Sequence, residues 1–550
     1  MYLLLPDFYL FFYHQNFHII LMSVFVFVYL FSFFKTSQYL FVLFPFLFFI
    51  PAYIYYISIY HVEFNEQILS IVIETDIQEV LQFLGGNIYF YIFFYFSWLV
   101  YCIYICYKNY FHPIVWCHWS RYLVLVLGTL YFLIGYSFNA AVVNDINAAT
   151  GSPEKNFLVE EENSFLKDLK QTYPLGLVIS SFNVFKEQKK INQAYEKNNN
   201  FKFDAKRSEF LDEKEIYVLV LGETSRKESW QLNGYTRKTN PKLSQQENLV
   251  NFTNFISLSS ATRSSIPMML TRKSDKAVYR YDFAEKSVIS AFREAGFKTY
   301  WLSTQQKIGV YDTSTSVYAK EADEIHFLNK TGYTNAGEYD DVLIPLFNKI
   351  VENPEKKRLI VIHTLGSHYN YVHRYPSSFA KFKPDLSSLN NYSLQELKYK
   401  KELRNSYDNS IIFTDYVLNS LIQILKSQTE VRSFLLYSSD HGEDLFDKKC
   451  LKSGHGLETA RNFEIAGFAW YSDKFENQSP EKVKYLKDNK DRKINQTSIF
   501  PSLIDAADIS IPNDSLSRSI LKNFKNYPRL VMGGRDYDQA KFIGECKEIK

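Results

Sequence analysis

The sequence predicts an N-terminal multi-span α-helical membrane domain followed by a C-terminal soluble α/β domain. Three observations lead to this fold class. Residues 1–140 contain only three basic and six acidic side chains, whereas the rest of the 550-residue chain contains 59 basic and 53 acidic ones. The front part holds four apolar runs of about 20 residues, the length that crosses a bilayer. In the back part, β-rich runs alternate with helical ones, as in a largely parallel sheet.

The apolar front end contains four candidate spans, at residues 17–34, 38–61, 88–107 and 122–140. Residues 1–13 are also apolar, but Pro6 interrupts them and Asp7 adds a charge. They form either a short fifth span or an interfacial anchor. A cleaved signal peptide is disfavoured, because the start has no basic region and further spans follow it.

The loops between the spans predict their orientation. Lys35 lies between the first two spans, and Lys108 and Arg121 lie between the last two. The loop 62–87 carries five acidic side chains and no Lys or Arg. Because Lys and Arg mark cytoplasmic loops, we expect this loop and everything after residue 140 to lie on the other side of the membrane. The spans are either an anchor without chemistry or, through the acidic loop, part of a substrate site.

The anchor comprises residues 1–140. The chain after it is predicted to divide into a bridging segment, 141–212, and a soluble domain, 213–550. Strands are expected at 216–221, 299–303, 359–363 and 433–438, and helices at 163–197, 284–295, 339–351 and 406–426. The helix at 163–197 is expected to lie along the membrane surface. A net charge of +3 gives no support to a nucleic-acid binder. Only Cys450 and Cys546 lie in the soluble part, so at most one disulfide is possible there.

Polar residues follow three of the expected strands at the point where each strand ends. Glu223 follows the first, His363 and His368 belong to the end of the third, and Asp440 and His441 follow the fourth. The carboxyl ends of parallel strands share one edge of a sheet, where ligands collect. Carboxylates and imidazole suit zinc, and carboxylates also suit manganese. Consecutive side chains reach one metal only where the strand breaks, and Gly442 permits such a break.

A hydroxyl-rich segment supplies candidates for a nucleophile. Residues 257–269 read SLSSATRSSIPMM and include Thr262, Ser264 and Ser265. A hydroxyl is a weak nucleophile until a metal lowers its pKa. The alternative is a helix cap, which fits Ser264 or Ser265 ahead of Pro267.

These motifs together resemble a known family. The strings GETSR, NGYTRKTNP, SSATRSSIPMM, HTLGSH and SSDHGE are similar to those of the phosphoethanolamine transferases of Gram-negative bacteria, which belong to the alkaline phosphatase and sulfatase superfamily. The resemblance covers most of the chain, including the multi-span anchor. The pieces AGFKTYWLSTQQ, GSHYNYVHRYP and SSDHGEDLFD look more like the branch that modifies heptose in the lipopolysaccharide inner core than the lipid A branch.

The resemblance implies a site and a reaction. Glu223, Thr262, Asp440 and His441 would hold one zinc ion, with a second possible during turnover. Thr262 would attack phosphatidylethanolamine, release diacylglycerol and become phosphoethanolamine-modified, after which a sugar hydroxyl of lipopolysaccharide would take the group. The protein would be a multi-pass protein of the bacterial inner membrane, with its catalytic domain in the periplasm.

The resemblance also implies roles for residues outside that set. His363, His368 and His455 match histidines that lie near the phosphate or a second metal, and would stabilise phosphate charge or protonate the leaving oxygen. Thr75 and Glu79, in the external loop, match substrate-binding positions of the membrane domain.

Two differences disfavour lipid A as the acceptor: Ile71 stands where lipid A enzymes have an Asn, and Leu258 and Met268 stand where they have a cysteine pair.

Other functions remain as alternatives. A sulfatase would need an Arg four positions after its modified residue, and Ser265 is followed by 266–269, which lack one. A glycerophosphate polymerase of the lipoteichoic acid type shares the anchor-plus-domain plan but uses phosphatidylglycerol. The two remaining alternative functions are a hydrolase that releases ethanolamine phosphate and a scaffolding protein with an inactive domain.

Overall fold

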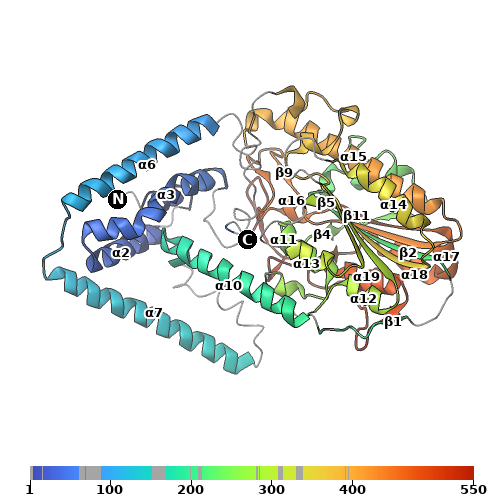
Figure 1. Ribbon diagram of the computed structural model, residues 1–550, viewed down its shortest axis with the longest axis horizontal. Helices are drawn as coiled ribbons and strands as arrows, with labels where there is room; N and C mark the ends of the chain where they lie inside the picture. Colours follow the sequence, from blue (N-terminus) through green and yellow to red (C-terminus); the bar gives the residue numbers. More distant parts are fainter. Residues whose placement is uncertain are drawn as a thin grey trace. The chain divides into compact units, whose positions relative to one another are not determined.

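The computed structural model describes residues 4–14, 17–60, 69, 88–150, 169–198, 200–207, 213–279, 283, 285–306, 314–329, 338–389, 392–393 and 395–550 (Figure 1). These residues belong to two compact units that divide at about Lys189. The first unit contains the apolar helices, and the second contains the α/β domain.

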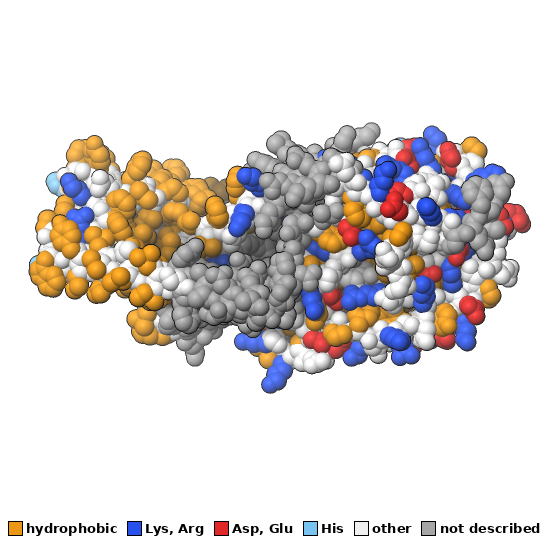
Figure 2. All heavy atoms as spheres, turned by 90° about the horizontal axis from the view of Figure 1, so that it is seen from below, with side chains coloured by type: hydrophobic (Ala, Val, Ile, Leu, Met, Phe, Trp, Pro, Cys, Tyr) orange, Lys and Arg blue, Asp and Glu red, His pale blue; other side chains and the backbone are white. Residues whose placement is uncertain are grey.

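The first unit is built from helices wherever the structure describes it. They are α1 (Leu5–His14), α2 (Phe17–Phe33), α3 (Thr36–Tyr60), α6 (Ile88–Phe111), α7 (Ser120–Thr150) and the start of α10 (Leu175–Asn198). Segments of α3 and α6 are long and apolar enough to cross a membrane, and α2 and α7 contain shorter apolar stretches. Large hydrophobic side chains cover the surface of these helices (Figure 2), as lipid-facing helices require.

The second unit is organised around a seven-stranded sheet with the order β3-β11-β8-β2-β7-β5-β6. Its strands are β2 (Glu215–Gly222), β3 (Leu249–Asn251), β5 (Lys298–Gln306), β6 (Glu324–Asn329), β7 (Lys357–His363), β8 (Arg432–Ser439) and β11 (Gly467–Tyr471). Strands β8, β2, β7, β5 and β6 are parallel, and β11 is antiparallel to β8 and β3. All eight residues of the central strand β2 are buried, as expected for a strand covered on both faces.

Helices cover both faces of this sheet (Figure 1). They are α11 (Thr262–Leu270), α12 (Val288–Glu294), α13 (Ser314–Ala319), α14 (Leu343–Glu352), α15 (Lys400–Lys426), α16 (Ala460–Phe463), α17 (Asp473–Gln478), α18 (Pro480–Asp488) and α19 (Ile499–Ala506). Alternate residues of β2 enter different cores: Tyr217 packs with side chains of α12 and α19, and Val218 packs with side chains of α14 and α15. The fold class expected from the sequence is therefore confirmed.

The second unit also contains short two-stranded sheets outside the main sheet. They are β1 (Lys206–Arg207) with β13 (Ile509–Ser510), β4 (Phe255–Ile256) with β12 (Ile494–Asn495), β9 (Asp444–Leu445) with β10 (Ser453–Gly454), β14 (Leu530–Val531) with β15 (Arg535–Asp536), and β16 (Phe542–Ile543) with β17 (Glu548–Ile549). The last pair lies beside the start of α16, because the backbone N–H of Ala460 donates to the carbonyl of Lys547 at 2.9 Å.

All four expected strands are confirmed, but helix boundaries differ from prediction. The helix expected at 284–295 begins at Val288, because the side chain of Ser287 accepts a hydrogen bond from the N–H of Ile289 and caps it. The helix expected from residue 406 begins at Lys400. Its first turn is charged and lacks an apolar period, but Arg404 bonds to Asp447 at 2.6 Å and holds the turn in place.

A disulfide joins Cys450 to Cys546 across 96 residues of sequence. Closing a loop of this length in the unfolded chain is worth about 4–5 kcal/mol by chain entropy. We therefore expect Cys450→Ser and Cys546→Ser each to lower the melting temperature by several degrees, measured by thermal unfolding in detergent. Cys117→Ser, which alters an exposed free thiol, is the matched control. Equal melting temperatures for all the variants would contradict a stabilising role of this bridge.

Candidate metal centre and nucleophile

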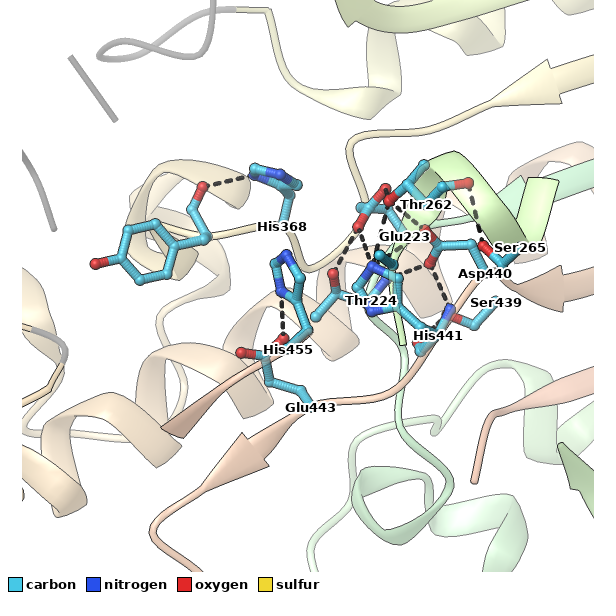
Figure 3. Close-up of polar contacts among 12 residues, drawn as sticks. Glu223, Thr224, Thr262, Ser265, His368, Ser439, Asp440, His441, Glu443 and His455 are labelled. Carbon is cyan, nitrogen blue, oxygen red and sulfur yellow. Dashed lines mark hydrogen bonds and ion pairs between the residues drawn. The ribbon is translucent and has the colours of Figure 1, made fainter. Parts of the chain in front are cut away.

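Four polar side chains converge beyond the carboxyl ends of two neighbouring strands (Figure 3). Strand β2 ends at Gly222, which pairs with Ser439 at the end of β8, so Glu223 and Asp440 start adjacent loops. His441 comes next on the second loop. Thr262 is the first residue of α11, whose N-cap is Ala261. The structure thus brings together the four residues that the resemblance implied as a set.

The donor atoms of these side chains surround a small common space. Thr262 Oγ1 lies 2.7 Å from Asp440 Oδ2, 3.3 Å from His441 Nε2 and 3.4 Å from Glu223 Oε2. His441 Nε2 lies 3.3 Å from Asp440 Oδ2 and 3.4 Å from Glu223 Oε1. In a tetrahedral zinc site with bonds of about 2.0–2.1 Å, ligand atoms lie about 3.3–3.4 Å apart. Four of the five separations already have that length.

Burial makes this set of donors unfavourable without a cation. Glu223 and Asp440 are almost fully buried beside each other. Burial, and next the negative charge of Asp440, raise the pKa of Glu223 well above its usual range. His441 Nδ1 lies 3.0 Å from the carbonyl of Gly442, so Nδ1–H donates there and Nε2 keeps its lone pair. Two carboxylates, an imidazole nitrogen and a hydroxyl therefore fit a zinc ion in chemistry and in spacing.

Gly442 serves the site for a different reason from the one the sequence suggested. A Cβ atom at this position would lie 2.0 Å from the carbonyl oxygen of Arg461. The glycine is therefore required by the close approach of another backbone, which keeps the loop after His441 against the start of the following helix.

Thr224 holds both carboxylates, although the sequence analysis did not single it out. Its N–H donates to Asp440 Oδ1 at 2.9 Å, and its hydroxyl donates to Glu223 Oε1 at 2.6 Å. Asp440 Oδ2 and Glu223 Oε2 are left facing Thr262. Thr224 has a φ of 56°, a left-handed conformation that is costly for a β-branched residue. This strain lets one residue bind both carboxylates.

Replacing Thr224 with valine tests this arrangement. Valine has the same shape and the same backbone strain but lacks the hydroxyl, so it removes the hydrogen bond to Glu223 alone. Loss of such a supporting contact weakens metal binding about 10- to 100-fold. We expect that loss for zinc, measured by competition with a chromogenic chelator, and expect Thr224→Ser to restore binding. Equal zinc affinity in the valine variant and the parent would refute the role.

The histidines predicted around the phosphate fall into two groups. His455 Nδ1 lies 3.0 Å from Glu443 Oε2, its ring lies 4.4 Å from the ring of His441, and the ring of His368 lies 6.0 Å from that of His455. His363, at the end of β7, packs against Trp301 and feels the negative charge of Asp440, and its role near the phosphate stays a prediction. Burial lowers the pKa of His363 to about 4.

Glu443 is a second residue that the sequence analysis missed. It is fully buried, accepts a hydrogen bond from Tyr371 Oη at 2.7 Å on Oε1, and contacts His455 on Oε2. The sequence signal that could have identified Glu443 is its position two residues after His441, in the string DHGE. Donor atoms of His441, Glu443 and His455 lie within 4.8 Å of one another, so these three side chains could hold a second cation.

Gly366, in the loop after β7, presses against the backbone of Glu223. Asp340 fixes this loop by accepting from the N–H groups of Leu365 and Gly366 at 2.9 and 2.8 Å. Gly366 has a φ of 50°, and a Cβ there would lie 2.7 Å from the carbonyl oxygen of Glu223.

We expect Gly366→Ala to move Glu223 and to lower both the melting temperature and the affinity for zinc. Gly234→Ala is the matched control, because Gly234 also has a positive φ, 89°, but nothing lies within 4 Å of the added Cβ. The control should lose only the stability that a left-handed backbone conformation costs a residue with a Cβ, about 1–2 kcal/mol. Equal losses of zinc affinity in the two variants would show that the contact with Glu223 is unimportant.

Thr75 and Glu79, the predicted substrate-binding residues of the external loop, lie outside the described residues. Their assignment stays a prediction.

The sulfatase family model matches residues 215–509. Phosphoethanolamine transferase EptC of Escherichia coli O18:K1:H7 is 29% identical over 341 residues, which cover 60% of this chain and 57% of that protein. The Kdo(2)-lipid A phosphoethanolamine 7''-transferase of Salmonella typhimurium is 28% identical over 314 residues, covering 55% and 53%. The chain thus spans little more than half the length of these curated relatives.

Solved structures extend the likeness. The periplasmic domain of EptC from Escherichia coli in complex with Zn has a TM-score of 0.55 at 27% identity, covering 63% of this chain and 94% of that one. The integral membrane phosphoethanolamine transferase EptA of Neisseria meningitidis has a TM-score of 0.65 at 22% identity, covering 87% and 86%, and so shares the fold across both units. The match at residues 215–509 includes all four converging side chains, and by it the chain belongs to the sulfatase family.

Proposed function

We propose that the protein transfers phosphoethanolamine from phosphatidylethanolamine to lipopolysaccharide, at an inner-core heptose, through a phosphothreonine on Thr262. The observation that carries this proposal is the place of Thr262 Oγ1. It lies 2.7 to 3.4 Å from donor atoms of Asp440, His441 and Glu223 and at the N-terminus of α11. A helix N-terminus favours the negative charge of a phosphate group.

The chain's own residues account for the proton and phosphate chemistry. The Thr262 hydroxyl donates to Asp440 Oδ2, so Asp440 is placed to accept its proton as the Oγ1–P bond forms and the bond from phosphorus to the diacylglycerol oxygen breaks. Glu443 fixes the ring of His455, and the ring of His368 lies 6.0 Å from that of His455. These imidazoles would give a proton to the diacylglycerol oxygen and take one from the attacking sugar hydroxyl.

Zinc is the proposed cofactor, with Glu223, Thr262, Asp440 and His441 as its ligands. When bound there, it supplies a Lewis acid that lowers the pKa of the hydroxyl and balances the two buried carboxylates. The Zn complex of the E. coli EptC domain supports this choice.

The proposed location is the bacterial inner membrane, with residues 1–140 as a multi-pass anchor, 141–212 as a bridge and 213–550 in the periplasm. Apolar helices in the first unit and the disulfide in the second support this, since disulfides persist in oxidising compartments. Thr75 and Glu79 would contact substrate from the membrane side. An anchored enzyme meets lipid substrates at a high effective concentration.

The proposal is tested by supplying the full chain in lipid nanodiscs with headgroup-labelled phosphatidylethanolamine and lipopolysaccharide. Mass spectrometry then compares lipid A and core fragments. Label on core heptose is the expected result. Label on lipid A would move the acceptor to the other branch; two relatives are named for transfer to Kdo(2)-lipid A. Release of ethanolamine phosphate alone would make the protein a hydrolase, and activity only with phosphatidylglycerol would make it a glycerophosphate transferase.

A further inference from the structure

Exposed hydrophobic side chains of the second unit gather on two short segments. Among the described residues after 200, five large hydrophobic side chains are exposed, and three of them are Leu451, Phe542 and Ile543. Leu451 is 68% exposed and follows Cys450 directly. Phe542 and Ile543 form β16, close to Cys546. Because a disulfide joins the two cysteines, these side chains belong to one surface, which we call the lysine tip and define as residues 448–452 and 541–550.

The lysine tip is a fixed structure. Beyond the disulfide, Lys452 Nζ lies 2.7 Å from Glu548 Oε1, and the N–H of Lys550 donates to the carbonyl of Lys541 at 3.1 Å. Ile549 of β17 is buried in a small core with Phe463 of α16. The exposure of the hydrophobic side chains is therefore built into the fold.

The tip is also strongly basic. It contains six lysines, at 448, 449, 452, 541, 547 and 550, and two glutamates, which gives 15 residues a net charge of +4. Lys452 is paired with Glu548, and within the described part of the chain no carboxylate forms an ion pair with the other five lysines. Exposed hydrophobic groups together with lysines are the composition that binds at the boundary between anionic headgroups and acyl chains.

The tip lies next to the candidate active site. Its strand β17 bridges to Thr459, and the N–H of Ala460 donates to the carbonyl of Lys547. The loop that leads to Thr459 also includes Gly456, whose N–H donates at 2.9 Å to the carbonyl of Ser260, two residues before Thr262. A surface that binds the tip would thus lie close to the nucleophile's loop.

We propose that the lysine tip docks the second unit on an anionic lipid surface, with Leu451, Phe542 and Ile543 entering the headgroup boundary and the lysines contacting lipid phosphates. Charge complementarity decides for lipid over a second copy of the chain, whose matching tip would carry the same charge. Docking itself does not depend on the proposed reaction. If that reaction is correct, docking also brings Thr262 to the headgroups it would attack.

Hydrogen–deuterium exchange of the full chain tests this proposal. The protein is placed in nanodiscs of phosphatidylcholine alone or of phosphatidylcholine rich in phosphatidylglycerol. We expect slower exchange of residues 448–452 and 541–545 in the anionic discs and reversal by high salt. Lys449→Gln and Lys541→Gln should each weaken docking about fivefold, and Leu451→Asp should abolish it.

Matched controls come from exposed residues elsewhere in the same unit. Lys484→Gln and Lys490→Gln, in or beside α18, remove equal charge, and Ile325→Asp changes a side chain that is 40% exposed on the edge strand β6. These variants should dock like the parent. Equal exchange in both kinds of disc, or equal losses in controls and tip variants, would overturn the proposal. Protection that depends on protein concentration in detergent would also overturn it, by assigning the tip to contacts between copies. None of these readouts needs catalytic activity.

Discussion

Thr262→Ala is expected to lower phosphoethanolamine transfer by about 10³-fold or more, because it removes the proposed nucleophile and with it the covalent intermediate. Folding should be preserved: Thr262 is only partly buried, and alanine is favourable at the start of a helix. Initial rates of diacylglycerol release measure the loss. Intact mass adds a direct reading, since the parent incubated with donor alone should gain one phosphoethanolamine group and the variant should gain none.

The neighbouring hydroxyl provides the control. Ser265 lies one turn further along the same helix, and its Oγ donates to the carbonyl of Thr262 at 3.3 Å. Ser265→Ala should therefore transfer within a few-fold of the parent and still gain the mass. Near-normal turnover of Thr262→Ala, or modification that persists in it, would reject the assignment of Thr262.

Stripping the metal is expected to abolish transfer and to destabilise the second unit. Without a cation, the buried Glu223 and Asp440 carboxylates would repel each other unless Glu223 keeps a proton, and an uncompensated buried charge costs about 3–5 kcal/mol. A chelator should lower the melting temperature, and zinc should restore both stability and activity. Asp440→Asn removes one of the charges, so the chelator should shift its melting temperature less.

The destabilisation should grow with pH. In stripped protein the pKa of Glu223 lies well above its ordinary value of 4.5, so the folded state keeps a proton that the unfolded state has lost. Stability from this group is present at low pH and is lost as pH rises from the ordinary pKa of 4.5 toward the raised folded-state pKa, so the gap between zinc-loaded and stripped protein should widen over that range. A gap that is constant across this range would contradict the buried pair as its source.

Much of the site was predictable because its residues sit at the ends of hydrophobic strands. The strand at 216–221 and the Glu223 that follows it are local features, as are the strand at 433–438 and Asp440. Once parallel pairing is assumed, the shared edge of the sheet brings both carboxylates together. Thr262 was identified only through the resemblance, since the hydroxyls of Ser264 and Ser265 were equally available to reasoning from the segment itself.

The misses depended on contacts between distant parts of the chain. Glu443 binds His455 twelve positions away, a contact that the spacing of the two residues does not predict. Thr224 was adjacent to a predicted ligand, but its role arises from a left-handed backbone conformation, which cannot be predicted from the presence of a threonine.

The sequence by itself determined the division into an apolar helical part and an α/β part, the central strands and the identity of the candidate metal donors, because hydrophobic periodicity and short motifs are local. Only the tertiary structure decided which oxygen of each carboxylate faces Thr262, which histidine Glu443 holds, and that Leu451 and Phe542 share one basic surface. Those arrangements are set by a fixed backbone and by a disulfide spanning 96 residues, and neither leaves a local signal in the sequence.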